Sequence, residues 1–221
     1  MKKSETIILG IILSSLIIGA YFYPRMPEQF ASHWNFKGEV DGYMPKFWGL
    51  FIMPIIAFVL FLLFILIPKI DPLKKNIDKF RKYFDGFTVI INLFLLYVHT
   101  LAILWNIGAR FNMVRVLAPA FGTLFYCSGI LTKNTKKNWF IGIKTPWTLS
   151  SEKVWNKTHK IGGKLFKIAG IIAFSAILFT DYALFLIIVP GILVAFYTFV
   201  YSYLEYRKDE DSVKTKKSGI G

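Results

Sequence analysis

Residues 47–67, which read FWGLFIMPIIAFVLFLLFILI, decide the fold, because this stretch contains no charged side chain. A helix that crosses a hydrocarbon core of about 30 Å needs about 20 predominantly apolar residues. A helix also satisfies its own backbone N–H and C=O groups, which lipid cannot do. We therefore interpret residues 47–67 as a transmembrane helix that ends before Pro68.

Further apolar blocks lie on both sides of this stretch. Hydrophobic residues make up 55% of the 221 residues, and the mean hydropathy is +0.50. Such long apolar blocks are not typical of a soluble domain. The sequence predicts a single all-α domain over residues 1–221, a polytopic integral bundle in the cell membrane, with six transmembrane helices at about 6–23, 47–67, 87–107, 116–131, 165–180 and 183–203.

The positive charges indicate how the chain is oriented. With six spans, 22 of the 27 Lys and Arg residues lie on the side of both termini and 5 on the other. Positive charge marks the cytoplasmic side of a membrane protein. We expect cytoplasmic termini, an extracytoplasmic loop at 24–46, a cytoplasmic loop at 132–164 and a flexible cytoplasmic tail at 205–221. The net charge of +14 thus follows from topology, and we expect no direct nucleic-acid binding.

The sequence gives no support for catalysis or for a cofactor. Its histidines lie far apart, at His33, His99 and His159, and no nucleophile stands at a recognisable spacing from a base. His33 with Glu39 and Asp41 could bind a divalent ion, but their spacing matches no familiar ligand pattern. We predict a protein without enzymatic activity, bound metal or cofactor.

A stripe of polar residues lies on the third predicted helix. Asn92, His99 and Asn106 recur every seven residues and therefore share one helix face, with Thr88 close to the same line. Polar groups in lipid usually face the bundle interior. The stripe could form hydrogen bonds between helices, or it could line the path of a ligand or proton in a small transporter.

The loop before the fifth helix contains a run of unusual composition, NWFIGIKTPWTLSSEKVWNKTH, at residues 138–159. Gly142 and Pro146 predict an irregular segment. Ser150 is a candidate N-cap, and Glu152 would complement the dipole of the following helix. The run is either an amphipathic anchor at the membrane surface or a specific docking surface.

These residues resemble the signature of the sporulation-delaying-toxin immunity (SdpI-like) family. Lys144 departs from it, because family members more often have arginine there. The residues at the signature positions are Asn138, Trp139, Phe140, Gly142, Lys144, Thr145, Pro146, Trp147, Thr148, Ser150, Glu152, Trp155, Thr158 and His159. The first loop resembles a domain of unknown function that often precedes this signature, through Pro27, His33, Trp34, Asn35, Gly38, Asp41 and Gly42.

The resemblance implies a membrane immunity and signal-transduction protein. It implies resistance to a secreted toxic peptide sensed from outside, and capture of a soluble transcriptional repressor at the cytoplasmic face. We expect the working surface of the signature to be formed by Pro146, Trp147, Glu152, Trp155 and His159. The alternatives are a small transporter or permease and a structural membrane protein.

Overall fold

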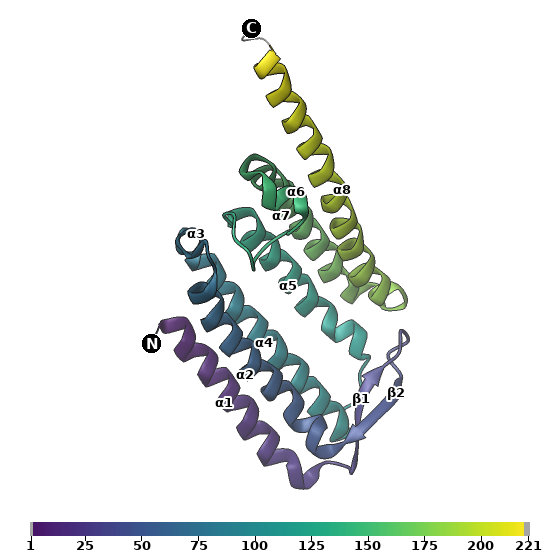
Figure 1. Ribbon diagram of the computed structural model, residues 1–221. Coiled ribbons are helices and arrows are strands. Elements are labelled where there is room, and N and C mark those ends of the chain that lie inside the picture. The colour runs from purple at the N-terminus through teal and green to yellow at the C-terminus, as the bar shows by residue number, and fades with distance from the viewer. Residues whose placement is uncertain (1, 219–221) are drawn as a thin grey trace.

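The computed structural model describes the backbone of residues 2–218 and the side chains of residues 2–212. Within these residues, six helices are long and apolar enough to cross a membrane, which confirms the predicted class. The main elements along the chain are α1 (Lys3–Phe22), β1 (Gln29–Trp34), β2 (Val40–Pro45), α2 (Lys46–Ile70), α3 (Lys74–Asp78), α4 (Arg81–Asn106), α5 (Met113–Asn134), α6 (Pro146–Ser150), α7 (Glu152–Ser175) and α8 (Ala183–Ser218) (Figure 1).

The long helices form two units of three. In the N-terminal unit, α1, α2 and α4 pack around a cluster that includes Ile8, Ala57 and Phe61. In the C-terminal unit, α5, α7 and α8 pack around small residues such as Ala118 and Ala173. Between the two units, the main contact of long helices is that of α4 with α5 (Figure 1).

Glycines set the spacing of α5 and α7, the most closely packed helix pair. A Cβ on Gly129 would lie 2.6 Å from the carbonyl oxygen of Gly163, and one on Gly163 would lie 2.7 Å from that of Gly129. The backbones can therefore approach only because neither position carries a side chain. Small residues at such crossings are typical of helix packing in lipid.

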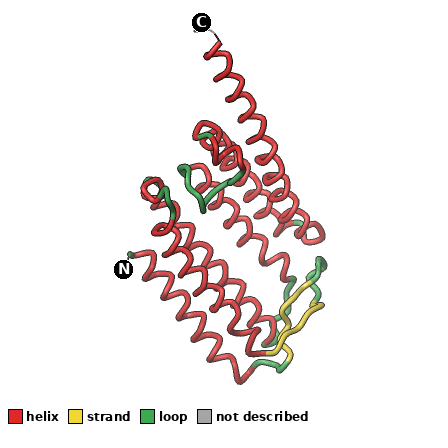
Figure 2. The backbone as a smooth tube through the Cα atoms, in the orientation of Figure 1, coloured by secondary structure: helices red, strands yellow, loops and turns green. Residues whose placement is uncertain are grey.

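The first loop forms a β-hairpin, which the sequence analysis did not predict. β1 and β2 pair antiparallel with an irregular register around His33, at one end of the bundle (Figure 2). Asn106 at the end of α4 fixes this hairpin, because its side chain accepts from Ala31 N at 2.8 Å and donates to Ala31 O at 3.0 Å. An amide side chain thus occupies the place of a neighbouring strand.

Two predicted boundaries were wrong. The fifth long helix begins at Glu152 rather than near residue 165, because Ser151, and not Ser150, caps it by accepting from Val154 N. The tail is helical through Ser218 rather than irregular from residue 205. Its acidic residues explain this order, since Glu205 pairs with Lys157 at 2.5 Å and Asp209 with Lys153 at 2.7 Å, both on α7.

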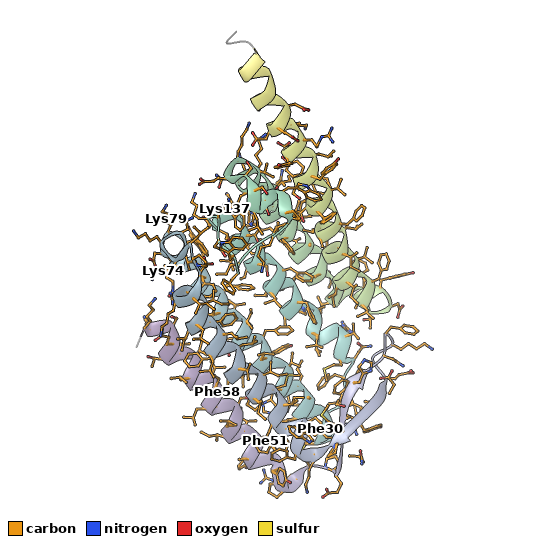
Figure 3. All side chains as sticks on the ribbon, viewed as in Figure 1. Phe30, Phe51, Phe58, Lys74, Lys79 and Lys137 are labelled. Carbon is orange, nitrogen blue, oxygen red and sulfur yellow. The ribbon has the colours of Figure 1, made fainter. Side chains whose placement is uncertain are left out.

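Both ends of the described chain lie toward the same end of the bundle, as six crossings require (Figure 1). We call this the motif end, because α3 and α6 also lie there, and the opposite end the hairpin end. Lys74 and Lys79 lie near Lys137 at the motif end, although they come from different connections, whereas Phe30 and Phe51 lie near the hairpin (Figure 3). Basic side chains thus gather at one end.

Candidate functional site

The run at residues 138–159 begins with a loop organised by one buried asparagine. The side chain of Asn138 donates to the carbonyl oxygens of Lys136 and Ile141, both at 2.8 Å. Its own oxygen accepts from the backbone N–H groups of Phe140 and Ile141. The side-chain amide of Asn138 therefore holds a tight loop through both its donor and its acceptor groups. Its role is structural.

The imidazole of His159 connects this loop to α7. Its Nε2 accepts from Ile143 N at 2.9 Å, and its Nδ1 lies 2.8 Å from the carbonyl oxygen of Trp155. Since Ile143 supplies a donor and Trp155 an acceptor, these partners assign the neutral tautomer with the proton on Nδ1. The ring also stacks on Trp155 at 3.9 Å, and Trp155 Nε1 donates to Thr135 O.

Gly142 permits this arrangement. Its φ is +113°, a conformation that side chains other than glycine's rarely adopt, and a Cβ there would lie 2.4 Å from His159 Nε2. The Gly142 backbone thus lies so close to the imidazole that no Cβ would fit between them. Glycine is needed for both the backbone angle and the contact.

The short helix α6 joins the loop to α8. Thr145 caps it by accepting from Thr148 N at 3.1 Å, and Thr148 Oγ1 accepts from Thr145 N in return. Thr145 also donates to Ser202 Oγ at 3.0 Å on α8, and Trp147 packs against the rings of Phe199 and Tyr203. Neither the capping role of Thr145 nor the partners on α8 could be read from the sequence pattern.

The same loop also contacts the N-terminal unit. Asp71, which is buried, accepts from Trp139 N at 2.9 Å, and the Asn76 side chain donates to Lys137 O at 2.9 Å. Ile141 packs into an apolar cluster with Ile77, Phe80 and Phe84 from α3 and α4. Sequence reasoning missed Asp71 and Asn76, although Asp71 follows directly on a long apolar helix.

The residues expected to form the working surface fall into an exposed group and a buried group. Pro146 and Glu152 are exposed and Trp147 is half-buried, but Trp155 and His159 are almost fully buried. The buried pair therefore holds the fold in this conformation. Residues of the signature that face outward also include Trp139, Phe140, Gly142, Lys144 and Ser150, whereas Asn138, Thr145, Thr148 and Thr158 are buried.

At the hairpin end, polar side chains stabilise the turn between β1 and β2. Asn35 Oδ1 accepts from Lys37 N and Glu39 N, and Asn35 Nδ2 donates to the Glu39 carboxylate at 3.0 Å. His33 Nδ1 lies 2.5 Å from Asp41 Oδ1. Within the described residues, no group of three His, Cys, Asp or Glu side chains is placed to hold a metal ion. The remaining expected hairpin residues are Pro27 before β1, Trp34 at its end, Gly38 in the turn and Gly42 opposite His33.

The signature run and the first loop both match known protein families. The SdpI/YfhL protein family matches residues 134–202, and a domain of unknown function, DUF1648, matches residues 10–58. The immunity protein SdpI of Bacillus subtilis is 26% identical over 209 residues, which cover 94% of this chain and 98% of that protein. The chain is thus similar to an SdpI-type immunity protein along nearly its whole length. No solved structure matches this chain.

The family regions map onto different units. The DUF1648 region covers most of α1, the hairpin and the first half of α2, all in the N-terminal unit. The SdpI/YfhL region runs from the end of α5 through α6 and α7 into α8, in the C-terminal unit. The signature loop belongs to the second region and touches the first unit through Asp71, Asn76 and the α3–α4 cluster.

The polar stripe lies inside the N-terminal unit. His99 Nδ1 is 2.6 Å from the hydroxyl of Ser15 on α1, and the Asn92 side chain donates to Thr88 O at 2.8 Å. Asn106 bonds the hairpin as described above. None of the three lines either of the two large cavities between the units. Helix packing and hairpin anchoring therefore account for His99 Nδ1 and Asn106, whereas His99 Nε2 and Asn92 Oδ1 are buried without a partner among the described residues.

Proposed function

We propose that this SdpI-like protein is a non-catalytic immunity protein of the cell membrane that confers resistance to a secreted toxic peptide. The observation that carries this proposal is the similarity to the immunity protein SdpI of Bacillus subtilis, which extends over nearly the whole of both chains. The similarity includes the hairpin and the signature loop, so both candidate surfaces belong to the shared region.

The same proposal assigns a side of the membrane to each end. The motif end carries most Lys and Arg residues, and positive charge favours the cytoplasmic side. The hairpin would then face outward, where a secreted peptide arrives. The signature loop and α6 would face the cytoplasm, where a soluble repressor could be captured by the exposed residues Lys144, Pro146 and Glu152.

Helix α4 supplies a physical route between the two ends. At one end Asn106 holds the hairpin, and at the other Phe84 packs with Ile141 of the signature loop. A peptide that displaces the hairpin would shift α4, and α4 would change the packing under Ile141. Such signalling requires two arrangements that differ in their affinity for the peptide.

The immunity function is tested by complementation. A Bacillus subtilis strain that lacks its own SdpI would express this chain and be exposed to the medium of toxin-producing cells. We expect growth to be rescued relative to an empty vector, with the protein detected in the membrane fraction. Unrescued growth despite normal membrane levels would contradict the proposed immunity to that peptide.

Capture of a partner is tested separately by photocrosslinking in native membranes. A photoreactive residue at Pro146 or Glu152 would face the partner, because both positions are exposed at the motif end. The control position is Leu193, which is 59% exposed on the apolar part of α8 and should reach only lipid. We expect a soluble DNA-binding protein to be captured from Pro146 or Glu152 after toxin exposure. Capture of lipid alone from all three positions would contradict the signalling role and leave the immunity function standing.

A further inference from the structure

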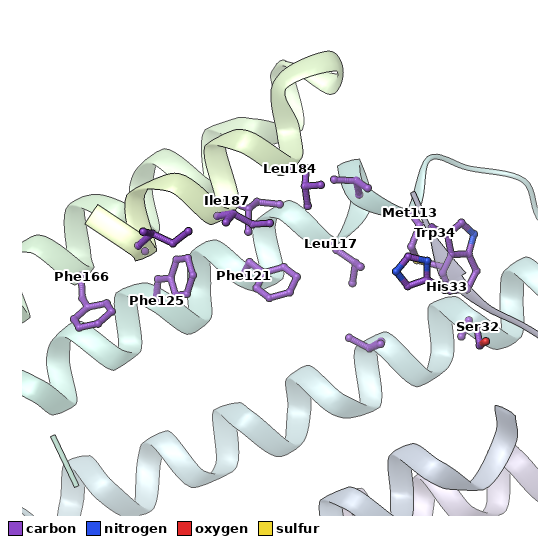
Figure 4. Close-up of a pocket in the computed structure, with 16 residues that line it drawn as sticks. Ser32, His33, Trp34, Met113, Leu117, Phe121, Phe125, Phe166, Leu184 and Ile187 are labelled. Atoms are coloured by element: carbon purple, nitrogen blue, oxygen red, sulfur yellow. The ribbon is translucent and has the colours of Figure 1, made fainter. Parts of the chain in front are cut away.

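The largest cavity described between the two units is an apolar groove near the hairpin. It has a volume of about 580 Å³ and lies between α4, α5 and α8, with Val98, Leu117, Phe121 and Ile187 among its lining side chains. Figure 4 shows the groove from Phe166 and Phe125 at one end to Met113, His33 and Trp34 at the other. Polar side chains line it only at the hairpin end, where Ser32, His33 and Trp34 lie.

The length of the groove matches one leaflet of a bilayer. Along α5 it extends from Met113 to Phe125, and at a rise of 1.5 Å per residue this is roughly 18 Å. Half of a hydrocarbon core is about 15 Å. The groove therefore runs from the level of the hairpin to the middle of the membrane, and it ends where the second cavity, which shares Phe125 and Phe166, begins.

Trp34 brings an unpaired hydrogen-bond donor to the hairpin end of the groove, and a cation lies two aromatic rings away from it. Trp34 Nε1 is buried and has no acceptor among the described residues. The ring of Trp34 contacts Trp105 at 5.8 Å, and the exposed guanidinium of Arg110 lies 3.9 Å over the Trp105 ring. A buried N–H without a partner is costly, so this end favours a ligand that brings an oxygen acceptor.

We propose that the groove binds one acyl chain of a phospholipid from the leaflet on the hairpin side, with a headgroup or ester oxygen accepting from Trp34 Nε1. The apolar walls suit the chain, the length suits one leaflet, and Arg110 suits a negatively charged headgroup. A helical peptide does not fit, because a helix with side chains is about 10–12 Å wide, and the volume of about 580 Å³ would hold about one turn of it. A bound lipid would fill the space between the units beside the hairpin.

The test is native mass spectrometry of the full-length protein. Wild type would be reconstituted in vesicles of phosphatidylglycerol and phosphatidylethanolamine, extracted in mild detergent and compared with two α4 variants. Val98→Trp fills the groove, whereas Leu93→Trp places the same side chain on an exposed position outside it. We expect wild type and Leu93→Trp to retain a phospholipid and Val98→Trp to lose it.

A third variant, Trp34→Phe, separates loss of the site from loss of the fold. It keeps a six-membered aromatic ring but removes the N–H together with the five-membered ring of the indole, so we expect lipid retention to weaken by at least the roughly 2- to 12-fold that corresponds to one hydrogen bond. Circular dichroism would check that each variant keeps its helices. Equal retention by all four proteins, or a retained mass that corresponds to a polypeptide or a second copy of the chain, would overturn the proposal.

Discussion

At the scale of single residues, the signature loop depends on close contacts with the His159 imidazole that a larger side chain would disturb. His159 accepts from Ile143 N and stacks on Trp155, and the Gly142 backbone lies against the same imidazole. The two ring nitrogens of His159 and the side-chain amide of Asn138 find their partners inside the protein. Such a loop presents its exposed neighbours from a rigid base, which is what a docking surface requires.

Gly142→Ala tests this site. We expect it to lower the free energy of unfolding by about 1–3 kcal/mol, because alanine is strained at positive φ and its Cβ would meet His159 Nε2 at 2.4 Å. The measurement is denaturant unfolding in detergent, followed by tryptophan fluorescence.

The matched control is Gly10→Ala on α1, where an added Cβ meets nothing within 4 Å. This control should be at least as stable as wild type, because alanine favours the helix more than glycine does. If Gly142→Ala were as stable as wild type, the close approach of the loop to His159 would not contribute to stability.

At the scale of elements, the hairpin and α4 behave as one body because a side chain completes the strand. Asn106 exchanges two hydrogen bonds with Ala31 and donates a third to Ala102 O. The buried residues Phe30 and Ile103 pack in one cluster beside it. The hairpin is therefore attached to a transmembrane helix and is more than a loop at its surface.

Asn106→Leu is expected to loosen this attachment. Leucine has a similar size but leaves Ala31 N and O without the partners they have now, at about 1–3 kcal/mol for each buried group. Limited proteolysis from the hairpin side should cut residues 29–45 faster than in wild type. Asn134→Leu, which loses only a bond to Ile130 O within its own helix, serves as the control. Identical cleavage of the two variants would argue against anchoring by Asn106.

At the scale of the whole molecule, the distribution of basic residues predicts the orientation in the membrane. In a Cys127→Ser background, a cysteine at exposed Lys37 in the hairpin should react with a membrane-impermeant maleimide on intact cells. A cysteine at exposed Lys136 should react only after the cells are opened. Labelling of Lys136→Cys on intact cells would reverse the proposed orientation.

Much of the membrane fold could be predicted from the sequence, and the physical reason is the length of the apolar blocks. Residues 47–67 predict a helix because lipid leaves the backbone no other way to satisfy its polar groups. The hairpin was not predicted, and its attachment to α4 could not be, because Asn106 is 75 positions from Ala31 in the sequence. A helix after Ser150 was expected, but not that it runs without a break into the fifth span. The helical tail was missed because it depends on pairs such as Lys157 with Glu205, which become neighbours only after folding.

The sequence predicted which segment forms the candidate site, but not how the residues of that segment are arranged. Trp155 and His159 were expected at its surface, since amphipathic spacing does not tell which face of a helix a distant loop will cover. Asn138 was identified only as part of a motif, and its four hydrogen bonds show that it shapes the loop. Asp71 and Asn76 carry no signal in the sequence that would connect them with the signature.

The division into two three-helix units has an evolutionary consequence. The two family regions fall in different units, and among the long helices the units meet mainly along α4 and α5. Substitutions in the hairpin can therefore accumulate without disturbing the residues that pack around His159. A recombined gene that joins the first half of one relative to the second half of another, at the exposed link around Gly108, would need to match the α4–α5 seam, the bonds and the apolar cluster at the motif end, and the bond from Asn112 to Lys37 O at the hairpin end. The two ends of the molecule can thus diversify independently of each other.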